Sequence, residues 1–295
     1  MQRLLVKTEL HDLPLLKRGK VRDIYRVDGK LLIIATDRIS ALDFVLPTGI
    51  PYKGVVLNKV SNFWFERTAK IVKNHVLSAD VRTFPESLDP HFDLLEGRSV
   101  LVDEVQPLPV ECIVRGYLSG SAWKEYRERG DVQDAGLPAG LQISSKLAKP
   151  IFTPSTKGEL GEHDVPVSQQ WMEETLGKEL ASAVKTVSLE LYQFAADIAF
   201  KRGIIVADTK FEFGLRNGEL ILIDELFTPD SSRFWRVEDY APGRAQDGLD
   251  KQLVRDWLSS VQWHKTPPPI PDQIVAETQR RYLDILEKLT GERIV

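Results

Sequence analysis

Hydrophobic and polar residues alternate along two pairs of segments in a way that predicts β-hairpins. The first pair, residues 21–26 and 30–35, is separated by Val27-Asp28-Gly29. Asp-Gly between apolar runs is a strong hairpin signal, because Gly tolerates the positive φ that a tight turn needs. The second pair, residues 203–214 and 219–226, turns at Asn217-Gly218. Each half of the chain is therefore expected to contain a hairpin.

Elsewhere apolar residues recur at helical spacing. Between residues 54 and 72 this spacing predicts an amphipathic helix that packs on the first sheet. Further helices are expected at residues 122–129, 169–201, 250–261 and 272–289.

Proline marks the expected division of the chain. Two strands, at about residues 99–105 and 110–115, are joined by Gln106-Pro107-Leu108-Pro109. Because Pro cannot donate to a ladder, this joint is expected to be a stiff, exposed connector. We place the domain boundary there, with a β-rich lobe at residues 1–109 and a second lobe at residues 110–295. The polar, proline-containing residues 137–168 are either a lid or binding loop or a plainly flexible segment.

Composition narrows the class of protein. The chain has 295 residues, of which 42% are hydrophobic and 28% charged, as in a folded water-soluble protein. A net charge of −4 gives no general attraction to nucleic acid or anionic membrane. The apolar runs are too short to span a bilayer and the N-terminus lacks a secretion signal, so we expect a cytoplasmic protein. The single cysteine, Cys112, is expected in the core, and no residue pattern indicates zinc.

The most informative strand is the first half of the second hairpin. Side chains alternate across a strand, so Asp208, Lys210 and Glu212 share one face. Burying such charges is costly unless they are paired or meet a cation. On this stretch alone, a structural ladder of salt bridges and a functional site are equally good readings.

The return strand favours the functional reading. It runs from aliphatic residues to Asp224, which arrives beside Glu212. Two carboxylates on adjacent strands suit Mg²⁺, which takes one or two carboxylates together with phosphate oxygens. A strict two-residue turn, however, places Phe211 opposite Asp224. The shared site is therefore expected to need a one-residue shift, through a three-residue loop or a bulge near Gly214.

Three further segments combine charge with small residues. Residues 17–22 carry four cations around Gly19, which suits polyphosphate, although a solvated basic turn is the better reading of this segment alone. Residues 115–121 join a strand to a helix with an Arg and two Ser, which is typical either of a phosphate site or of an ordinary Ser N-cap. Residues 228–233 add a carboxylate, hydroxyls and an Arg directly after the acidic strand.

Taken together, these segments resemble the phosphoribosylaminoimidazole-succinocarboxamide synthase (SAICAR synthetase) family. The resemblance rests on five motifs that occur in the family's order between residues 19 and 233. They are Gly19-Lys20-Val21-Arg22-Asp23-Ile24-Tyr25, Thr36-Asp37-Arg38-Ile39-Ser40-Ala41-Leu42-Asp43, the run from Glu111 to Ser121, Asp208-Thr209-Lys210-Phe211-Glu212-Phe213-Gly214, and the run from Leu222 to Arg233.

The resemblance implies an α+β, two-lobed fold. Its N-terminal lobe is an antiparallel sheet like that of protein kinases, and its C-terminal lobe is ATP-grasp-like and ends in helices. It also implies a reaction in which ATP and Mg²⁺ drive condensation of carboxyaminoimidazole ribonucleotide (CAIR) with L-aspartate to SAICAR, ADP and phosphate, through an acyl phosphate. The implied partners are these small molecules, with no nucleic acid or membrane, and the chain is expected to be a monomer or homodimer.

The resemblance also implies roles for particular residues. The nucleotide is expected at Gly19, Lys20, Arg22 and Glu104, together with Glu212 and Asp224, which also bind the metal. The ribotide is expected at Arg115, Ser119, Ser121, Asp208, Lys210, Asp230 and Arg233, and the catalytic residues are Lys210, Glu212 and Asp224. Weaker candidates are Ser155, Lys157, Glu159, Asp250 and Arg255.

Three other functions stay open at this point. The alternatives are another ATP-grasp-like carboxylate–amine ligase, a small-molecule phosphotransferase, and a non-catalytic nucleotide-binding module. The absence of a His-Arg-Asp catalytic loop and of Asp-Phe-Gly weighs against the phosphotransferase. The many charged groups weigh against the binding module.

Overall fold

The computed structural model describes residues 4–157 and 165–294. Contacts divide the chain into two compact units. The first comprises Met1–Arg67, Asn74–Val105 and Asp250–Val295, and the second comprises Thr68–Lys73 and Gln106–Leu249. The C-terminal segment Asp250–Val295 therefore belongs to the first unit when the chain is divided by its contacts. The division into functional lobes at residue 109 stays a prediction.

An antiparallel sheet of five strands, in the order β1-β2-β3-β7-β6, forms the centre of the first unit. The expected hairpin is confirmed: β2 and β3 turn at Asp28 and Gly29, which have φ of 48° and 73°. Tyr25, Leu32 and Ile34 of this sheet are buried in a cluster with residues of short helices. The elements are β1 (Leu15–Arg18), β2 (Arg22–Val27), β3 (Lys30–Ala35), β6 (Val76–Ser78), β7 (Ser99–Val102), η1 (Val81–Thr83), η2 (Glu86–His91) and α2 (Phe92–Leu95).

Three longer helices complete the first unit, and each matches a predicted one. Helix α1 begins where the backbone N–H of Gly54 donates to the buried Asp37 carboxylate, 2.9 Å away, which satisfies one of the free donors of a helix start. The C-terminal helices pack with the segment around Ile39 and Ile50. The elements are α1 (Lys53–Thr68), α6 (Gln252–Ser260), α7 (Asp272–Thr290), β4 (Ser40–Ala41) and β5 (Phe44–Val45).

The second unit contains a six-stranded sheet with β11 and β8 at its centre. Strand β11 pairs with β8, β12 and β13, and β8 also pairs with β9 and β10. Cys112 is buried and free within β8, as predicted. The elements are β8 (Gln106–Tyr117), β9 (Lys146–Phe152), β10 (Ser155–Thr156), β11 (Ile204–Arg216), β12 (Glu219–Ile223), β13 (Ser232–Arg236), α3 (Gly120–Arg129), α4 (Gln169–Leu176) and α5 (Lys178–Lys201).

Two sequence predictions about connecting segments are wrong. The proline-containing residues 106–109 are not a connector but the first third of β8, where Pro107 pairs with Gly214 next to an irregularity in the ladder. Such a position tolerates Pro because the regular donor is not required there. Residues 137–168 are not one long loop, since β9 and β10 lie within them and extend the sheet. Residues 158–164 lie outside the described part.

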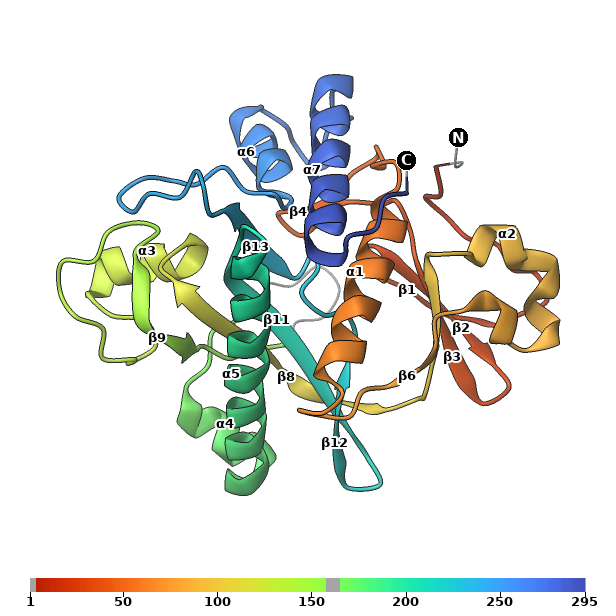
Figure 1. Ribbon diagram of the computed structural model, residues 1–295, viewed down its shortest axis with the longest axis horizontal. Coiled ribbons are helices and arrows are strands. Elements are labelled where there is room, and N and C mark those ends of the chain that lie inside the picture. Colours follow the sequence, from red (N-terminus) through yellow and green to blue (C-terminus); the bar gives the residue numbers. More distant parts are fainter. Residues whose placement is uncertain (1–3, 158–164, 295) are drawn as a thin grey trace. The chain divides into compact units, whose positions relative to one another are not determined.

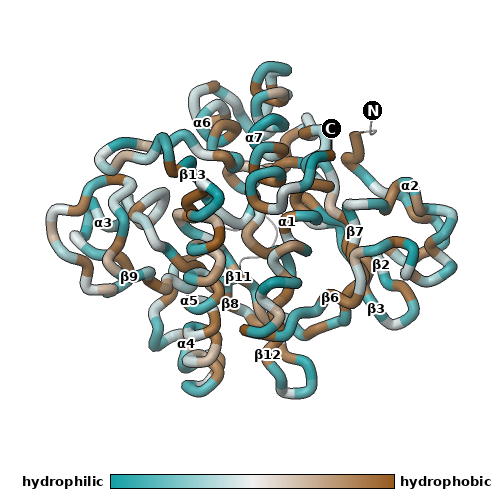
Figure 2. Tube along the Cα trace, in the orientation of Figure 1, coloured by the Kyte–Doolittle hydropathy of each residue, from teal (hydrophilic) through white to brown (hydrophobic). Residues whose placement is uncertain are grey.

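The single helix expected at residues 169–201 is two helices. Gly177, with φ 82° and ψ 149°, separates α4 from α5. A non-glycine residue would strain in this conformation, so glycine marks the break. Helix α5 lies against β8 and β11 (Figure 1). Figure 2 shows hydrophobic and hydrophilic positions alternating along α5, whose buried side includes Val184, Leu191 and Ala195.

The β11–β12 hairpin keeps the plain two-residue register. Arg216 pairs with Glu219 and Glu212 pairs with Ile223, without any shift between them. The predicted one-residue shift is therefore wrong. Strand β12 ends at Ile223, and Asp224 leaves it with φ 75°. Because Asp tolerates this left-handed conformation better than most residues, the chain turns after the strand instead of within the hairpin.

Candidate active site

A buried group of opposite charges surrounds Lys210 on β11. Its Nζ atom lies 2.5 Å from Glu111 Oε1 and 2.9 Å from Glu212 Oε1. Glu111 lies on β8 directly opposite Glu212 in the register. The second oxygen of Glu212 accepts a hydrogen bond from Lys157. The glutamate side chains are only 7% and 10% exposed, so these charges interact in a weakly screened environment.

The mutual attraction keeps this group ionised. Burial opposes the charged form of Lys210, but Glu212, Glu111 and Asp224 outweigh it and raise the lysine pKa well above its ordinary value. Burial likewise opposes ionisation of Glu212, and Lys210 with Lys157 outweighs it, so the Glu212 pKa is lowered. Lys210 is therefore an ammonium group at neutral pH. It can stabilise negative charge but is not suited to accept a proton.

The predicted magnesium ligands are Glu212, which belongs to this group, and Asp224. In the described ranges, no three His, Cys, Asp or Glu residues are arranged to enclose a metal. Mg²⁺ does not need such an enclosure, because it commonly takes one or two carboxylates and fills its shell with water and phosphate oxygens. Glu212 supplies one carboxylate, and Asp224 is near enough to raise the pKa of Lys210. Two carboxylates suit Mg²⁺ chemically, and the roles of Glu212 and Asp224 as metal ligands stay a prediction.

A second charged group lies on the same face of β11, around Asp208. Its Oδ2 atom lies 2.7 Å from Arg233 Nη1 and 3.7 Å from Arg115 Nη1. Asp208 pairs with Arg115 of β8 and with Arg233 of β13, so the sheet itself brings the three residues together. Burial opposes ionisation of Asp208, but the two guanidinium groups outweigh it and lower the carboxyl pKa. The trio carries a formal charge of +1, which suits an anion.

The turn into α3 is part of this second group. Ser119 stands at the N-cap position of α3 but makes no capping hydrogen bond. Its hydroxyl instead donates to Asp208, 3.0 Å away. Ser121 Oγ accepts from Arg115 Nη2 at 3.2 Å, and Arg115 Nε also donates to Thr153. The reading of Ser119 as an ordinary N-cap is therefore wrong.

Glycine is required within this turn. Gly120 has φ +56°, and a Cβ atom placed on it would lie 2.4 Å from Arg233 Nη2. The Arg233 guanidinium therefore rests against the bare backbone at the start of α3.

The segment that precedes β13 forms a compact turn. The Thr228 hydroxyl accepts from the backbone N–H groups of Asp230 and Ser231, each at 3.2 Å. It donates to Glu225 at 2.5 Å. Asp230 is partly exposed at this turn, three residues before Arg233. The turn thus fixes where β13 begins.

The predicted nucleotide residues lie in the first unit. Lys20 Nζ is 3.3 Å from Asp43 Oδ1, and Glu104 is paired with Arg26 at 2.8 Å. Gly19 lies between β1 and β2, and Arg22 is the first residue of β2. Their nucleotide contacts stay predictions.

The weaker candidates have mixed positions. The buried Ser155 hydroxyl has no hydrogen-bond partner among the described residues. Asp250 accepts from the backbone N–H of Gln252 at the start of α6, and Arg255 lies 3.9 Å from it. Glu159 lies outside the described residues.

Sequence reasoning did not single out Glu111 or Thr153. Glu111 was detectable, because it is a carboxylate inside the apolar run Val110-Glu111-Cys112-Ile113-Val114. An isolated charge in a central strand needs a partner. Thr153 carried no such signal.

The antiparallel sheets with their covering helices have the ATP-grasp-like fold of a synthetase. The family model of SAICAR synthetase matches residues 15–270. Phosphoribosylaminoimidazole-succinocarboxamide synthase of Thermodesulfovibrio yellowstonii is 54% identical over 99% of this chain and 100% of that protein. The same-named protein of Geobacter sulfurreducens is 52% identical over 99% of both. The chain belongs to the SAICAR synthetase family.

Solved structures agree with this assignment. SAICAR synthase of Saccharomyces cerevisiae in complex with SAICAR has a TM-score of 0.88 at 43% identity, covering 98% of this chain and 99% of that one. A SAICAR synthetase in complex with ADP has a TM-score of 0.70 at 22% identity, covering 95% and 99%, and supports the fold. Over residues 4–157 and 165–294, none of the helices has the length and apolar character needed to cross a bilayer.

Proposed function

We propose that this protein condenses CAIR with L-aspartate at the expense of ATP and releases SAICAR, ADP and phosphate. One observation carries the proposal in this chain. A single face of β11 presents Asp208 with two guanidinium groups and, two residues further on, Lys210 with two glutamates. A group with net positive charge and a group with two carboxylates thus lie side by side on one strand. This arrangement supports a ligase that must hold phosphorylated substrates and a metal ion.

The chemistry calls for positioning and charge neutralisation. A carboxylate is a poor electrophile, so the γ-phosphoryl group is first transferred to the CAIR carboxylate to give an acyl phosphate and ADP. The aspartate amine, in its neutral form, then attacks the acyl carbon, phosphate leaves, and the amine proton is released. Such phosphoryl transfer depends mainly on orientation and electrostatic stabilisation. When bound, Mg²⁺ at Glu212 and Asp224 supplies positive charge next to the phosphates.

The charged groups of the second unit have distinct roles in this proposal. The Lys210 ammonium group, held by Glu111 and Glu212, stabilises negative charge that develops on the reacting carboxylate and phosphoryl oxygens. The ribotide contacts are Arg115, Ser119, Ser121, Asp208, Asp230 and Arg233. Support for them comes from the hydrogen bonds that join Arg115, Ser121, Ser119, Asp208 and Arg233.

The remaining predicted nucleotide residues belong to the first unit. We assign Gly19, Lys20 and Arg22 to the ATP phosphates and the segment at Glu104 to the adenine side. In functional terms, residues 1–109 are the ATP-binding lobe and residues 110–295 are the substrate and metal lobe. The protein acts in the cytoplasm as a monomer or homodimer and binds no nucleic acid.

Product analysis tests the function. The purified protein is incubated with ATP, Mg²⁺ and L-aspartate, with and without CAIR, and products are separated by liquid chromatography and identified by mass spectrometry. The expected result is SAICAR and ADP in equal amounts, only when all substrates are present. A phosphorylated product formed without aspartate would instead identify a phosphotransferase. If the protein turned over only with a carboxylate other than CAIR, it would be a different ligase. If it showed no turnover with any substrate, the binding-module alternative would be favoured.

A further inference from the structure

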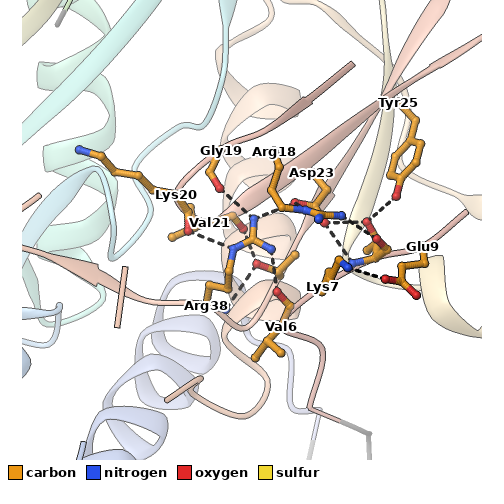
Figure 3. Close-up of polar contacts among 12 residues, drawn as sticks. Val6, Lys7, Glu9, Arg18, Gly19, Lys20, Val21, Asp23, Tyr25 and Arg38 are labelled. Carbon is orange, nitrogen blue, oxygen red and sulfur yellow. Dashed lines mark hydrogen bonds and ion pairs between the residues drawn. The ribbon is translucent and has the colours of Figure 1, made fainter. Parts of the chain in front are cut away.

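In the loop between β1 and β2, three successive carbonyl groups accept hydrogen bonds from two buried side chains, Arg38 and Thr36. Arg38 Nη2 donates to the Gly19 carbonyl at 3.0 Å, and Arg38 Nε donates to the Lys20 carbonyl at 3.1 Å. The Thr36 hydroxyl donates to the Val21 carbonyl at 2.7 Å. Figure 3 shows the Arg38 guanidinium between this loop and the chain at Val6.

Peptide geometry fixes where the loop's N–H groups point. In a trans peptide, the C=O of one residue and the N–H of the next are antiparallel within one plane. Because the Gly19 and Lys20 carbonyls face Arg38, the N–H groups of Lys20 and Val21 face the opposite direction. In the described part of the chain, neither N–H has a hydrogen-bond acceptor. Successive N–H groups that point outward form a concavity that binds anions.

Arg38 is itself held in place by a buried carboxylate. Its Nη2 atom lies 2.8 Å from Asp23 Oδ1, and Asp23 is fully buried. Asp23 also accepts from the hydroxyl and backbone N–H of Thr8, at 2.7 and 3.1 Å. Burial opposes ionisation of Asp23, but the hydrogen bonds from Arg38 and Thr8 outweigh it and lower the carboxyl pKa. Arg38 Nη1 completes the set by donating to the Val6 carbonyl at 2.8 Å.

We propose that Arg38, anchored by Asp23, is a positioning residue that turns the Lys20 and Val21 amides toward the phosphates of the bound nucleotide. The inference rests on the proposed function for the identity of the nucleotide and deepens it. To hold the loop in this way, the planar guanidinium of Arg38 must donate hydrogen bonds in three directions at once. A lysine ammonium on a flexible chain cannot reproduce this arrangement. Arg38 touches only protein groups and acts through the loop.

Arg18 provides a matched control. Its Nε atom also binds Asp23 Oδ1, at 3.2 Å, and its Nη2 atom donates to the Thr8 carbonyl at 2.8 Å. Arg18 therefore shares the anchor with Arg38 but makes no side-chain hydrogen bond to the carbonyls of residues 19–21. Arg18→Lys disturbs the anchor alone, whereas Arg38→Lys also releases the loop.

Binding of ADP and of adenosine to the wild type and both variants tests the proposal by calorimetry. Arg38→Lys is expected to weaken ADP binding roughly ten- to a hundredfold, the scale of a lost charge-assisted hydrogen bond. Adenosine binding should change less than about threefold, because adenosine has no phosphates, and Arg18→Lys should leave both ligands within the same range. CAIR binding to Arg38→Lys should equal that of the wild type. Equal losses for ADP and adenosine, or equal losses in both variants, would overturn the proposal.

A measurement on the wild type covers the case in which Arg38→Lys does not fold. Amide hydrogen exchange at Lys20 and Val21 should slow when ADP binds and stay unchanged with adenosine. Unchanged exchange with ADP would refute the proposal. These binding readouts do not depend on catalysis. A wild-type protein that binds ADP with protected amides but forms no SAICAR would refute the proposed function alone.

Discussion

Replacing Gly120 with alanine tests whether the start of α3 holds the Arg233 guanidinium. The new Cβ atom would lie 2.4 Å from Nη2 and 2.7 Å from Cζ of Arg233. Ordinary carbon contacts are about 3.5–4.0 Å, so the guanidinium must move by roughly 1 Å or more. That displacement breaks the 2.7 Å bond to Asp208. Because Arg233 is a proposed CAIR contact, the displaced guanidinium also loses a charge-assisted hydrogen bond to the ligand. Such a loss costs about 1.5–3 kcal/mol, which weakens CAIR binding by about ten- to 150-fold.

Gly130 separates this effect from backbone strain. It ends the same helix with φ +76°, and no atom lies within 4 Å of a Cβ placed there. Alanine at either position adds about 1–2 kcal/mol of left-handed backbone strain, so both variants should lose similar stability from that source. Only Gly120→Ala should also lose affinity for CAIR. Thermal unfolding and CAIR titration of both variants distinguish the two effects. Wild-type CAIR affinity in Gly120→Ala would show that Arg233 does not depend on this contact.

Three further predictions address the charged residues around β11. Asp224→Asn should keep the fold and lower turnover by about 10²–10³, the scale for losing one electrostatic stabiliser, and full activity at saturating Mg²⁺ would remove Asp224 from the metal site. Arg115→Lys and Arg233→Lys should each weaken CAIR binding by about 1.5–3 kcal/mol with little change in ATP affinity, and equal losses for both ligands in parallel titrations would contradict the assignment. The pKa of Asp208 is lower in the folded protein, so its stabilising contribution is complete above the unfolded value of about 3.9 and is lost as pH falls through the folded pKa. Asp208→Asn should therefore lose less stability than the wild type between about pH 5 and pH 2 in denaturant titrations, and parallel pH curves would refute this.

Predictions that depend only on the backbone preferences of a short segment were confirmed. The first hairpin followed from Asp28-Gly29, whose positive φ values the structure reproduces. The shared face of Asp208, Lys210 and Glu212 followed from the two-residue period of a strand. The same local reasoning found α1, α6 and α7 to within a few residues of their observed ends.

Two signals within single segments were misread. The prolines of residues 106–109 indicated a connector, yet β8 accommodates them at an irregular part of the ladder. The sequence around Gly177 continues a helical pattern on both sides, and the break became clear only from its φ. At residues 106–109, strand pairing overrode a local preference. At Gly177 the break is itself local, because glycine adopts a positive φ that other residues avoid.

The sequence by itself determined which residue types stand on one face of β11, and its motifs indicated the family. Only the tertiary structure decided which charges meet. Glu111 reaches Lys210 because β8 lies beside β11, and Arg233 reaches Asp208 because β13 lies on the other side. Asp224 departs from the strand at its end and not through the predicted shift in register. Strand order and dihedral angles depend on the packing of the whole sheet, and periodicity along one segment carries no information about them.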